Sequence, residues 1–375
     1  MFGSRTKWKI GRIGRVPIYV EPTWVVVVVL IAASQYARFD QVDPTHAFWL
    51  AMLFVGPFFG AVFVHELAHA WMSKRLSIPV RGITMMFFGG ATETRANSRG
   101  PGAEFMVSAA GPASTLVMSG VFWLISRSLH GAVHDVVVQL AGLNLLFAIF
   151  NTLPALPLDG GRMLTAIVWR ITGNRSNAQR VGGYVGTAVG IGVGVLAYQQ
   201  LTTGGGYGLF LLIVAFALVA TGRSTETRVR AQEQLAKGTA GDAMRAAPPA
   251  VPGGMSLQDA LERYLRAAPH DGFPVIDHGR VIGTVSVASA RKAGSRDPMR
   301  PVRDGMAPLD LTPVFREDES LDMVADWLNG MEGLVLRDGA LVGAIGPGEI
   351  THWYQRTILG EGGVGVAGIP PRPDL

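Results

Sequence analysis

Six apolar segments constrain this chain of 375 residues more strongly than any other feature of its sequence. Each approaches the roughly 20 residues with which a helix crosses about 30 Å of hydrocarbon, although the last segment is short. Charged residues make up only 16% of the chain, whereas soluble domains carry about 25%. The sequence therefore predicts a polytopic α-helical membrane protein. The expected spans are residues 18–33, 46–72, 103–127, 136–157, 181–201 and 207–222.

The charges are unevenly distributed along the chain. Residues 1–222 contain 16 Lys and Arg against 8 Asp and Glu, a balance of +8, whereas the remainder contains 17 against 20, a balance of −3. Five of these cations precede the first segment, and most of the others follow the second and fourth segments. Arg223, Arg228 and Arg230 follow the sixth. By the positive-inside rule, this pattern predicts a multi-pass protein of the cell membrane with both termini in the cytoplasm. It does not resemble a nucleic-acid surface, so no nucleic-acid partner is expected.

The composition changes near residue 222. Residues 224–237 are polar and predict a helical linker, and two similar blocks follow, in which GRVIGTV at 279–285 matches GALVGAI at 339–345. Two such repeats are typical of one compact soluble α/β domain. The expected organisation is a membrane domain at 1–223, the linker, a repeat pair at 238–357 and a disordered tail rich in Gly and Pro at 358–375.

The second apolar segment contains the motif His65-Glu66-Leu-Ala-His69. On a helix, His65 and His69 lie one turn apart on the same face, where their ring nitrogens can meet one metal ion. Glu66 is close enough to act on a water molecule there without being a ligand. Because the chain contains no cysteine, a metal must be held by His, Asp or Glu. The pattern favours zinc-assisted hydrolysis with a carboxylate base. The alternative is a helix end whose polar side chains lie at the membrane interface.

A catalytic zinc also needs a third protein ligand, and Asp159 is the best candidate. It follows Pro154 and Pro157, which end a helix, and precedes the flexible pair Gly160 and Gly161. Broken backbone at membrane depth is tolerated only inside protein or beside a wet cavity. The alternative role for Asp159 is the N-cap of a helix beginning near Met163. The presence of the two histidines favours the ligand role.

Asn144 and Asn151 are seven residues apart and are expected on one side of the fourth span. Asn residues in membrane helices often form hydrogen bonds between helices. Asn151 is also suited to stabilise an oxyanion during hydrolysis. Spacing alone does not decide between these roles.

HELAH in an apolar span, followed by N-x-x-P-x-x-P-L-D-G-G, resembles the site-2 protease family of intramembrane zinc metalloproteases. WKIGRIGRVPIYVEPTW at 8–24 resembles the N-terminal segment of that family, FGGATE at 88–93 its short membrane-associated β loop, and EFMVSAAGPAST at 104–115 the start of its third core helix. The resemblance implies one zinc per chain, held by His65, His69 and Asp159. It also implies Glu66 as general base and Asn151 as a helper near the scissile carbonyl.

Many members of that family have Asn where this chain has Thr115. We expect this position to be related to packing rather than to catalysis.

The resemblance implies an endopeptidase that cleaves single-pass membrane proteins within or near the lipid bilayer. An extended stretch of substrate is expected to pair with the β loop near residues 82–92, which would satisfy backbone groups that lipid cannot. The alternative is a metal-ion transporter or channel that uses the same His and Asp residues. The position of Glu66, and the lack of a visible inverted repeat in the membrane half, favour the protease.

The C-terminal repeats resemble a tandem of cystathionine-β-synthase (CBS) domains, which commonly sense adenine nucleotides. Such modules hold ribose and phosphate with a Ser or Thr and an Asp three residues later. Here the first repeat offers Ser286 and Ser289, and the second offers Gly346 and Glu349. Because neither pair is complete, the sequence leaves open whether the repeats bind a nucleotide, modulate the protease, form a homodimer or serve a purely structural role.

Overall fold

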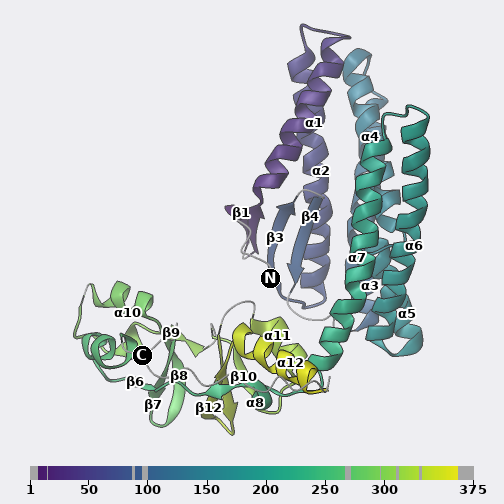
Figure 1. Cartoon of the computed structure of the whole chain (residues 1–375). Helices are drawn as coiled ribbons and strands as arrows, with labels where there is room; N and C mark the ends of the chain where they lie inside the picture. Colours follow the sequence, from purple (N-terminus) through teal and green to yellow (C-terminus); the bar gives the residue numbers. More distant parts are fainter. Residues whose placement is uncertain are drawn as a thin grey trace. The chain divides into compact units, whose positions relative to one another are not determined.

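The computed structural model describes residues 7–14, 16–86, 89–94, 100–266, 272–295, 297–309, 312–328 and 332–361. The chain divides into two compact units, Met1–Val229 and Arg230–Leu375 (Figure 1). Residues 362–375, most of the tail predicted to be disordered, lie outside the described residues. The prediction is wrong for residues 358–361, which belong to the helix Pro347–Glu361.

Long apolar helices form most of the first unit. Within the described residues, six are long and apolar enough to cross a bilayer, which confirms the expected membrane architecture. A shorter amphipathic helix, α5 (Asp159–Thr172), lies between the fourth and fifth of them. The six are α1 (Pro22–Asp40), α2 (Ala47–Arg75), α3 (Pro101–Ser126), α4 (Gly131–Thr152), α6 (Arg175–Thr202) and α7 (Gly208–Leu235).

Several boundaries differ from the sequence expectation. The fourth span begins at Gly131 rather than at residue 136, and the fifth begins at Arg175 rather than at residue 181. The first span was expected to begin at Ile18, but Val16–Val20 is a strand, and α1 begins after Glu21 with a proline in its first turn. Proline suits that place because the first helical N–H has no partner within the helix. The fourth span ends at Thr152, just before Pro154, rather than at residue 157. The polar stretch at 224–235 continues the sixth span, since α7 runs unbroken to Leu235.

A four-stranded sheet packs against α2. Its order is β1 (Trp8–Ile13), β2 (Val16–Val20), β3 (Val80–Met86) and β4 (Gly89–Thr94), and β2 and β3 are parallel because α1 and α2 connect them. Val16 and Val20 of the sheet share a core with Val62 and Ala70 of α2. Figure 1 shows β3 and β4 alongside the same helix. The sheet therefore covers the part of α2 that carries the histidine motif.

The second unit contains two similar four-stranded sheets within the described residues. Each sheet takes its last strand from the segment that precedes the other repeat, since β5 pairs with β12 and β9 pairs with β8. This exchange ties the two predicted repeats into one unit with two apolar cores. The strands are β5 (Arg245–Ala246), β6 (Val251–Pro252), β7 (Phe273–Asp277), β8 (Arg280–Val285), β9 (Ala307–Pro308), β10 (Val314–Arg316), β11 (Gly333–Arg337) and β12 (Ala340–Ile345). The helices are α8 (Ala240–Ala243), α9 (Leu257–Ala260), the π-helical turn η1 (Leu261–Leu265), α10 (Val287–Gly294), the 3-10 turn η2 (Val302–Asp304), α11 (Leu321–Leu328) and α12 (Pro347–Glu361).

Candidate metal centre

Helix α2 places His65, Glu66 and His69 in the interior of the first unit. All three are buried, with relative exposures of 4%, 5% and 7%. The two imidazole rings lie one turn apart, with centroids 4.8 Å apart and planes at 82°. The four-residue spacing therefore produces the shared face that the sequence predicts.

Asp159 reaches this face from a different part of the chain. Helix α4 ends at Thr152, the chain turns through Pro154 and Pro157, and α5 begins at Asp159 itself, four residues before the expected start near Met163. The N-cap position of α5 is Leu158, so Asp159 does not occupy the cap position that was the alternative. The turn leaves its carboxylate pointing at the two histidines.

Gly160 permits this turn because the chain folds back onto it. A Cβ atom at that position would lie 2.2 Å from the carbonyl oxygen of Thr152 and 2.3 Å from that of Leu153. Backbone atoms at that distance cannot move aside without unfolding the turn. The glycine after Asp159 is therefore needed to bring the carboxylate into place.

Three side-chain atoms meet at the centre of the site. Nε2 of His65 lies 3.1 Å from Nε2 of His69, and Oδ2 of Asp159 lies 3.1 Å and 3.3 Å from these two nitrogens. The three atoms form a nearly equilateral triangle. Lone pairs that converge in this way repel one another unless a cation or a proton lies between them.

Helix α3 orients both imidazoles from behind. Nδ1 of His69 donates to the carbonyl oxygen of Val107 at 2.7 Å, and that oxygen can only accept. Thr115 donates its hydroxyl proton to the carbonyl oxygen of Gly111 at 3.2 Å, so its oxygen accepts from Nδ1 of His65 at 2.8 Å. Both Nδ1 atoms thus carry protons, and both Nε2 atoms are available to a metal.

These dimensions fit zinc. Tetrahedral zinc binds nitrogen and carboxylate oxygen at about 2.0–2.2 Å, which places neighbouring ligand atoms about 3.3–3.6 Å apart. The observed separations of 3.1–3.3 Å lie just below the lower end of this range. Two histidines and one carboxylate are a common protein ligand set of catalytic zinc, and they leave the fourth position open.

The centre also requires empty space at Gly111 of α3. A Cβ atom there would lie 2.3 Å from Nε2 of His69 and 2.7 Å from Cε1 of His65. Val107, Gly111 and Thr115 follow one another at intervals of four residues, so they form one stripe on α3. This stripe supplies a carbonyl acceptor, a gap and a hydroxyl group to the histidines.

Thr115 corrects the sequence expectation. The position was expected to serve packing, but the side chain is fully buried and hydrogen bonds directly to His65. The signal that could have revealed this role is the repetition of small and polar residues along α3, where Ser108, Gly111, Thr115 and Ser119 are all buried. No sequence pattern indicated the carbonyl group of Val107, because every residue has a backbone carbonyl group whatever its side chain.

Glu66 lies beside the triangle. One of its carboxylate oxygens is within 4.8 Å of ring nitrogens of both His65 and His69. Glu66 lies on α2 together with His65 and His69, so one helix fixes the positions of the carboxylate and of both imidazoles. This arrangement places a carboxylate beside the two imidazoles.

Asn151 and Asn144 both lie buried on α4, as the seven-residue spacing predicts. The amide nitrogen of Asn151 donates to the carbonyl oxygen of Phe147 at 3.1 Å, and that of Asn144 donates to Leu140 at 2.8 Å. These bonds lie within their own helix and not between helices. The ring of Phe147 lies 5.3 Å from that of His65, so Asn151 is one turn from a residue that contacts the site.

The two incomplete motifs of the second unit are engaged in local contacts. The hydroxyl groups of Ser286 and Ser289 cap the start of α10. Glu349 accepts the backbone N–H of Gly346 at 3.0 Å and pairs with Arg245 at 3.2 Å, and Arg245 also pairs with Glu332.

Comparisons with known proteins match both units. A family model described as peptidase family M50 matches residues 53–132 and 126–193, and a CBS domain model matches residues 240–296. Rip3 of Mycobacterium tuberculosis, whose name describes a zinc metalloprotease, is 32% identical over 304 residues, which cover 78% of this chain and 77% of Rip3. The zinc metalloprotease MJ0392 of Methanocaldococcus jannaschii is 26% identical over 350 residues, or 91% and 94% of the two chains. The solved site-2 protease from that organism aligns with a TM-score of 0.43 at 19% identity, over 59% of this chain and 95% of the other.

Proposed function

The chain belongs to peptidase family M50, the site-2 proteases, and from this membership we propose that it is an intramembrane zinc endopeptidase that cleaves single-pass membrane proteins within or near the bilayer. The observation that carries the proposal is the triangle formed by Nε2 of His65, Nε2 of His69 and Oδ2 of Asp159, with Glu66 beside it. These three atoms would hold one zinc ion per chain.

The ion, when bound, polarises the scissile carbonyl group and lowers the pKa of water. Glu66 accepts a proton from the attacking water and later delivers it to the leaving amine. Thr115 and the carbonyl oxygen of Val107 keep the proton of each imidazole on Nδ1 throughout. Burial of the site excludes bulk water and strengthens each of these electrostatic interactions.

Asn151 is proposed as a donor to the oxyanion that forms on the substrate. One amide hydrogen is used by the carbonyl oxygen of Phe147, and the second remains for a ligand, since an Asn amide has two. A donor aimed at developing negative charge is a large contributor to hydrolysis of this kind.

The substrate is proposed to enter as an extended chain that pairs with the β3–β4 hairpin. Among the described strands, β4 is the last in the order of its sheet and is therefore an edge. Addition of a strand at this edge would satisfy the backbone groups of an unwound substrate helix.

Both termini and the CBS pair are proposed to lie in the cytoplasm, because the basic residues lie in the loops on the side of the termini. The CBS pair is proposed to modulate the protease and to mediate a homodimer. Arg245 already pairs with Glu349, so an adenine nucleotide at the second repeat would have to displace this ion pair.

The test is co-expression of the full chain with candidate single-pass proteins, comparing the wild type with Glu66→Gln by fragment size. The substitution keeps the shape of the side chain but removes the base, so we expect cleavage to fall by about 10²- to 10⁴-fold. Zinc content, measured on the purified variant, should stay at one ion per chain, because Glu66 is not a ligand in this scheme.

Undiminished cleavage by Glu66→Gln would contradict the role of Glu66. Uptake of zinc into sealed vesicles, without proteolysis, would instead support a metal-ion transporter that uses the same residues. The matched substitution Asp159→Asn separates the role of a metal ligand from the role of the base. It should remove zinc and cleavage together, whereas Glu66→Gln should remove cleavage alone.

A further inference from the structure

Strand β1 carries exposed side chains that the metal centre does not use. Trp8, Ile10 and Ile13 have relative exposures of 51%, 64% and 45%. Lys9 and Arg12, which lie between them in the sequence, are exposed as well. Large apolar side chains at the edge of a sheet are unfavourable in water, and soluble proteins avoid them.

The pairing with β2 separates these residues onto two faces. Trp8 lies opposite Val20 and Ile13 lies opposite Val16, and directly paired residues share a face of the sheet. Val16 and Val20 are buried in the core that the sheet forms with α2. Trp8 and Ile13 therefore lie on the same face of the sheet as that core but remain exposed beyond it, whereas Ile10 lies in the register shift between Lys9 and Gly11.

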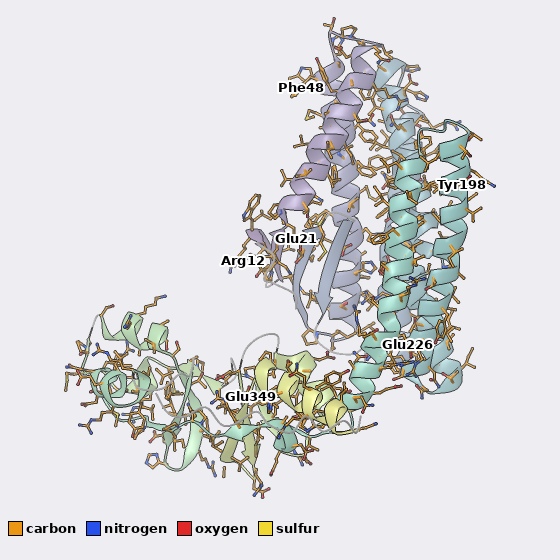
Figure 2. All side chains as sticks on the ribbon, in the orientation of Figure 1. Arg12, Glu21, Phe48, Tyr198, Glu226 and Glu349 are labelled. Atoms are coloured by element: carbon orange, nitrogen blue, oxygen red, sulfur yellow. The ribbon has the colours of Figure 1, made fainter. Side chains whose placement is uncertain are left out.

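The cations lie on the opposite face. Lys9 is paired with Tyr19 and Arg12 with Pro17. Figure 2 shows Arg12 projecting from the outer side of the hairpin, away from the helices of this unit. Within the part of the chain that the structure describes, no carboxylate lies within ion-pair distance of Lys9 or Arg12.

The hairpin is held close to the bilayer by its connection to α1. Strand β2 ends at Val20, and the membrane helix begins two residues later at Pro22. Val25, Val26, Val29 and Leu30 of α1 are exposed, so this face of the helix contacts lipid. A strand attached so directly to a lipid-facing helix lies at the boundary between membrane and water.

We propose that β1 is embedded in the headgroup layer, where Trp8 and Ile13 insert among the lipid chains and Lys9 and Arg12 bind the phosphates of anionic phospholipids. Trp is enriched at this depth of a membrane, and basic residues beside a membrane helix attract anionic lipid. A peptide paired with the edge of β1 would cover its backbone but would leave these side chains exposed. An anionic phospholipid would instead contact both faces of the strand, with its acyl chains at Trp8 and Ile13 and its phosphate at Lys9 and Arg12.

The test uses the absence of cysteine from the chain. Ile10→Cys provides one thiol for an environment-sensitive fluorophore in the full protein, reconstituted in nanodiscs. Quenching is compared between spin-labelled phosphatidylglycerol and spin-labelled phosphatidylcholine at equal mole fraction. The matched control is Val29→Cys, at a 59% exposed position within α1.

We expect phosphatidylglycerol to quench the label at position 10 more strongly, with a local enrichment of about five-fold for each cation. At position 29 the two lipids should quench equally. Adding Lys9→Ser and Arg12→Ser should abolish the preference at position 10 while quenching by both lipids persists.

Equal quenching by the two lipids at position 10 in the otherwise unchanged chain would overturn the anionic-lipid assignment. A preference that survives the loss of both cations would overturn the role of Lys9 and Arg12. Accessibility of position 10 to aqueous iodide, without quenching by either lipid, would place β1 in water and leave its edge to a peptide.

Discussion

The two units place their polar groups in opposite ways. Among the described residues, every buried polar or charged side chain lies in the first unit, including the four at the metal centre. In the second unit the charged groups lie at the surface, as Arg337 and Glu317 do, around cores built from apolar residues. The first unit is surrounded by hydrocarbon and collects its polar groups inside, whereas the second follows the pattern of a water-soluble domain.

This difference determines what a single substitution costs. A buried polar group that loses its partner keeps the full cost of desolvation, whereas water replaces the partner of an exposed group. We therefore expect the consequences of substitution to decrease from the metal centre of the first unit to the surface of the second.

The largest effect is expected for Gly111→Ala. The added methyl group would overlap Nε2 of His69, so zinc and proteolysis should be lost together. The matched control is Gly120→Ala on the same helix, where a Cβ atom meets nothing within 4 Å. Metal analysis and the cleavage assay on both variants check this prediction. Retention of stoichiometric zinc by Gly111→Ala would show that the site does not have the described packing.

Asn151→Ala should come next. Loss of a single oxyanion donor typically lowers kcat by about 10²- to 10³-fold, and zinc content should remain unchanged. Asn144→Ala is the control, because Asn144 makes the same kind of bond within the same helix. If the two variants lose activity equally, Asn151 has a structural role only.

Thr115→Val should have an intermediate effect. The variant keeps the shape of the side chain but removes the hydrogen bond to His65, and loss of such a partner typically costs 10- to 100-fold in metal affinity or activity. Thr115→Ser should restore most of the loss. Zinc affinity is measured by competition with a chelator. A valine variant that binds zinc as tightly as the wild type would return this position to a packing role.

The smallest effect is expected for Arg337→Ala in the second unit. The Arg337 guanidinium hydrogen bonds to Glu317 and lowers the pKa of that carboxyl below its ordinary value, although both groups are exposed. A lowered pKa in the folded state stabilises the protein above the ordinary pKa of the carboxyl, and this contribution is lost as the pH falls through the lowered value.

The thermal midpoint of full-length Arg337→Ala should therefore lie slightly below that of the wild type at neutral pH. The two should converge in acid, and proteolysis should be unaffected. A large loss of stability at neutral pH would contradict the expectation that substitutions of exposed charges in the second unit cost little.

Much of the first unit follows from local sequence patterns. The spacing of His65 and His69 places them on one face, and the apolar segments predict the helices, because both depend only on helical periodicity and on length. The prolines before Asp159 predict the break in α4 for the same local reason. Thr115 was misassigned, since its partner lies 50 residues away and hydrogen bonding across that distance has no periodic signature.

Val16–Val20 shows another limit of the sequence pattern. Hydropathy alone extended the expected helix back to Ile18, into the middle of this strand. Its alternation of buried and half-exposed residues arises because it pairs with β1 and β3, strands that lie before and after it in the chain.

The sequence by itself determined the membrane class, the repeat pair and the two imidazoles, because residue type and helical spacing are sufficient for each. Only the tertiary structure decided that Asp159 meets them and that α3 fixes their protons. The same is true of the gap at Gly111, which leaves room for the rings. These features depend on three helices that are distant in sequence, and their contacts are set by packing rather than by any local pattern.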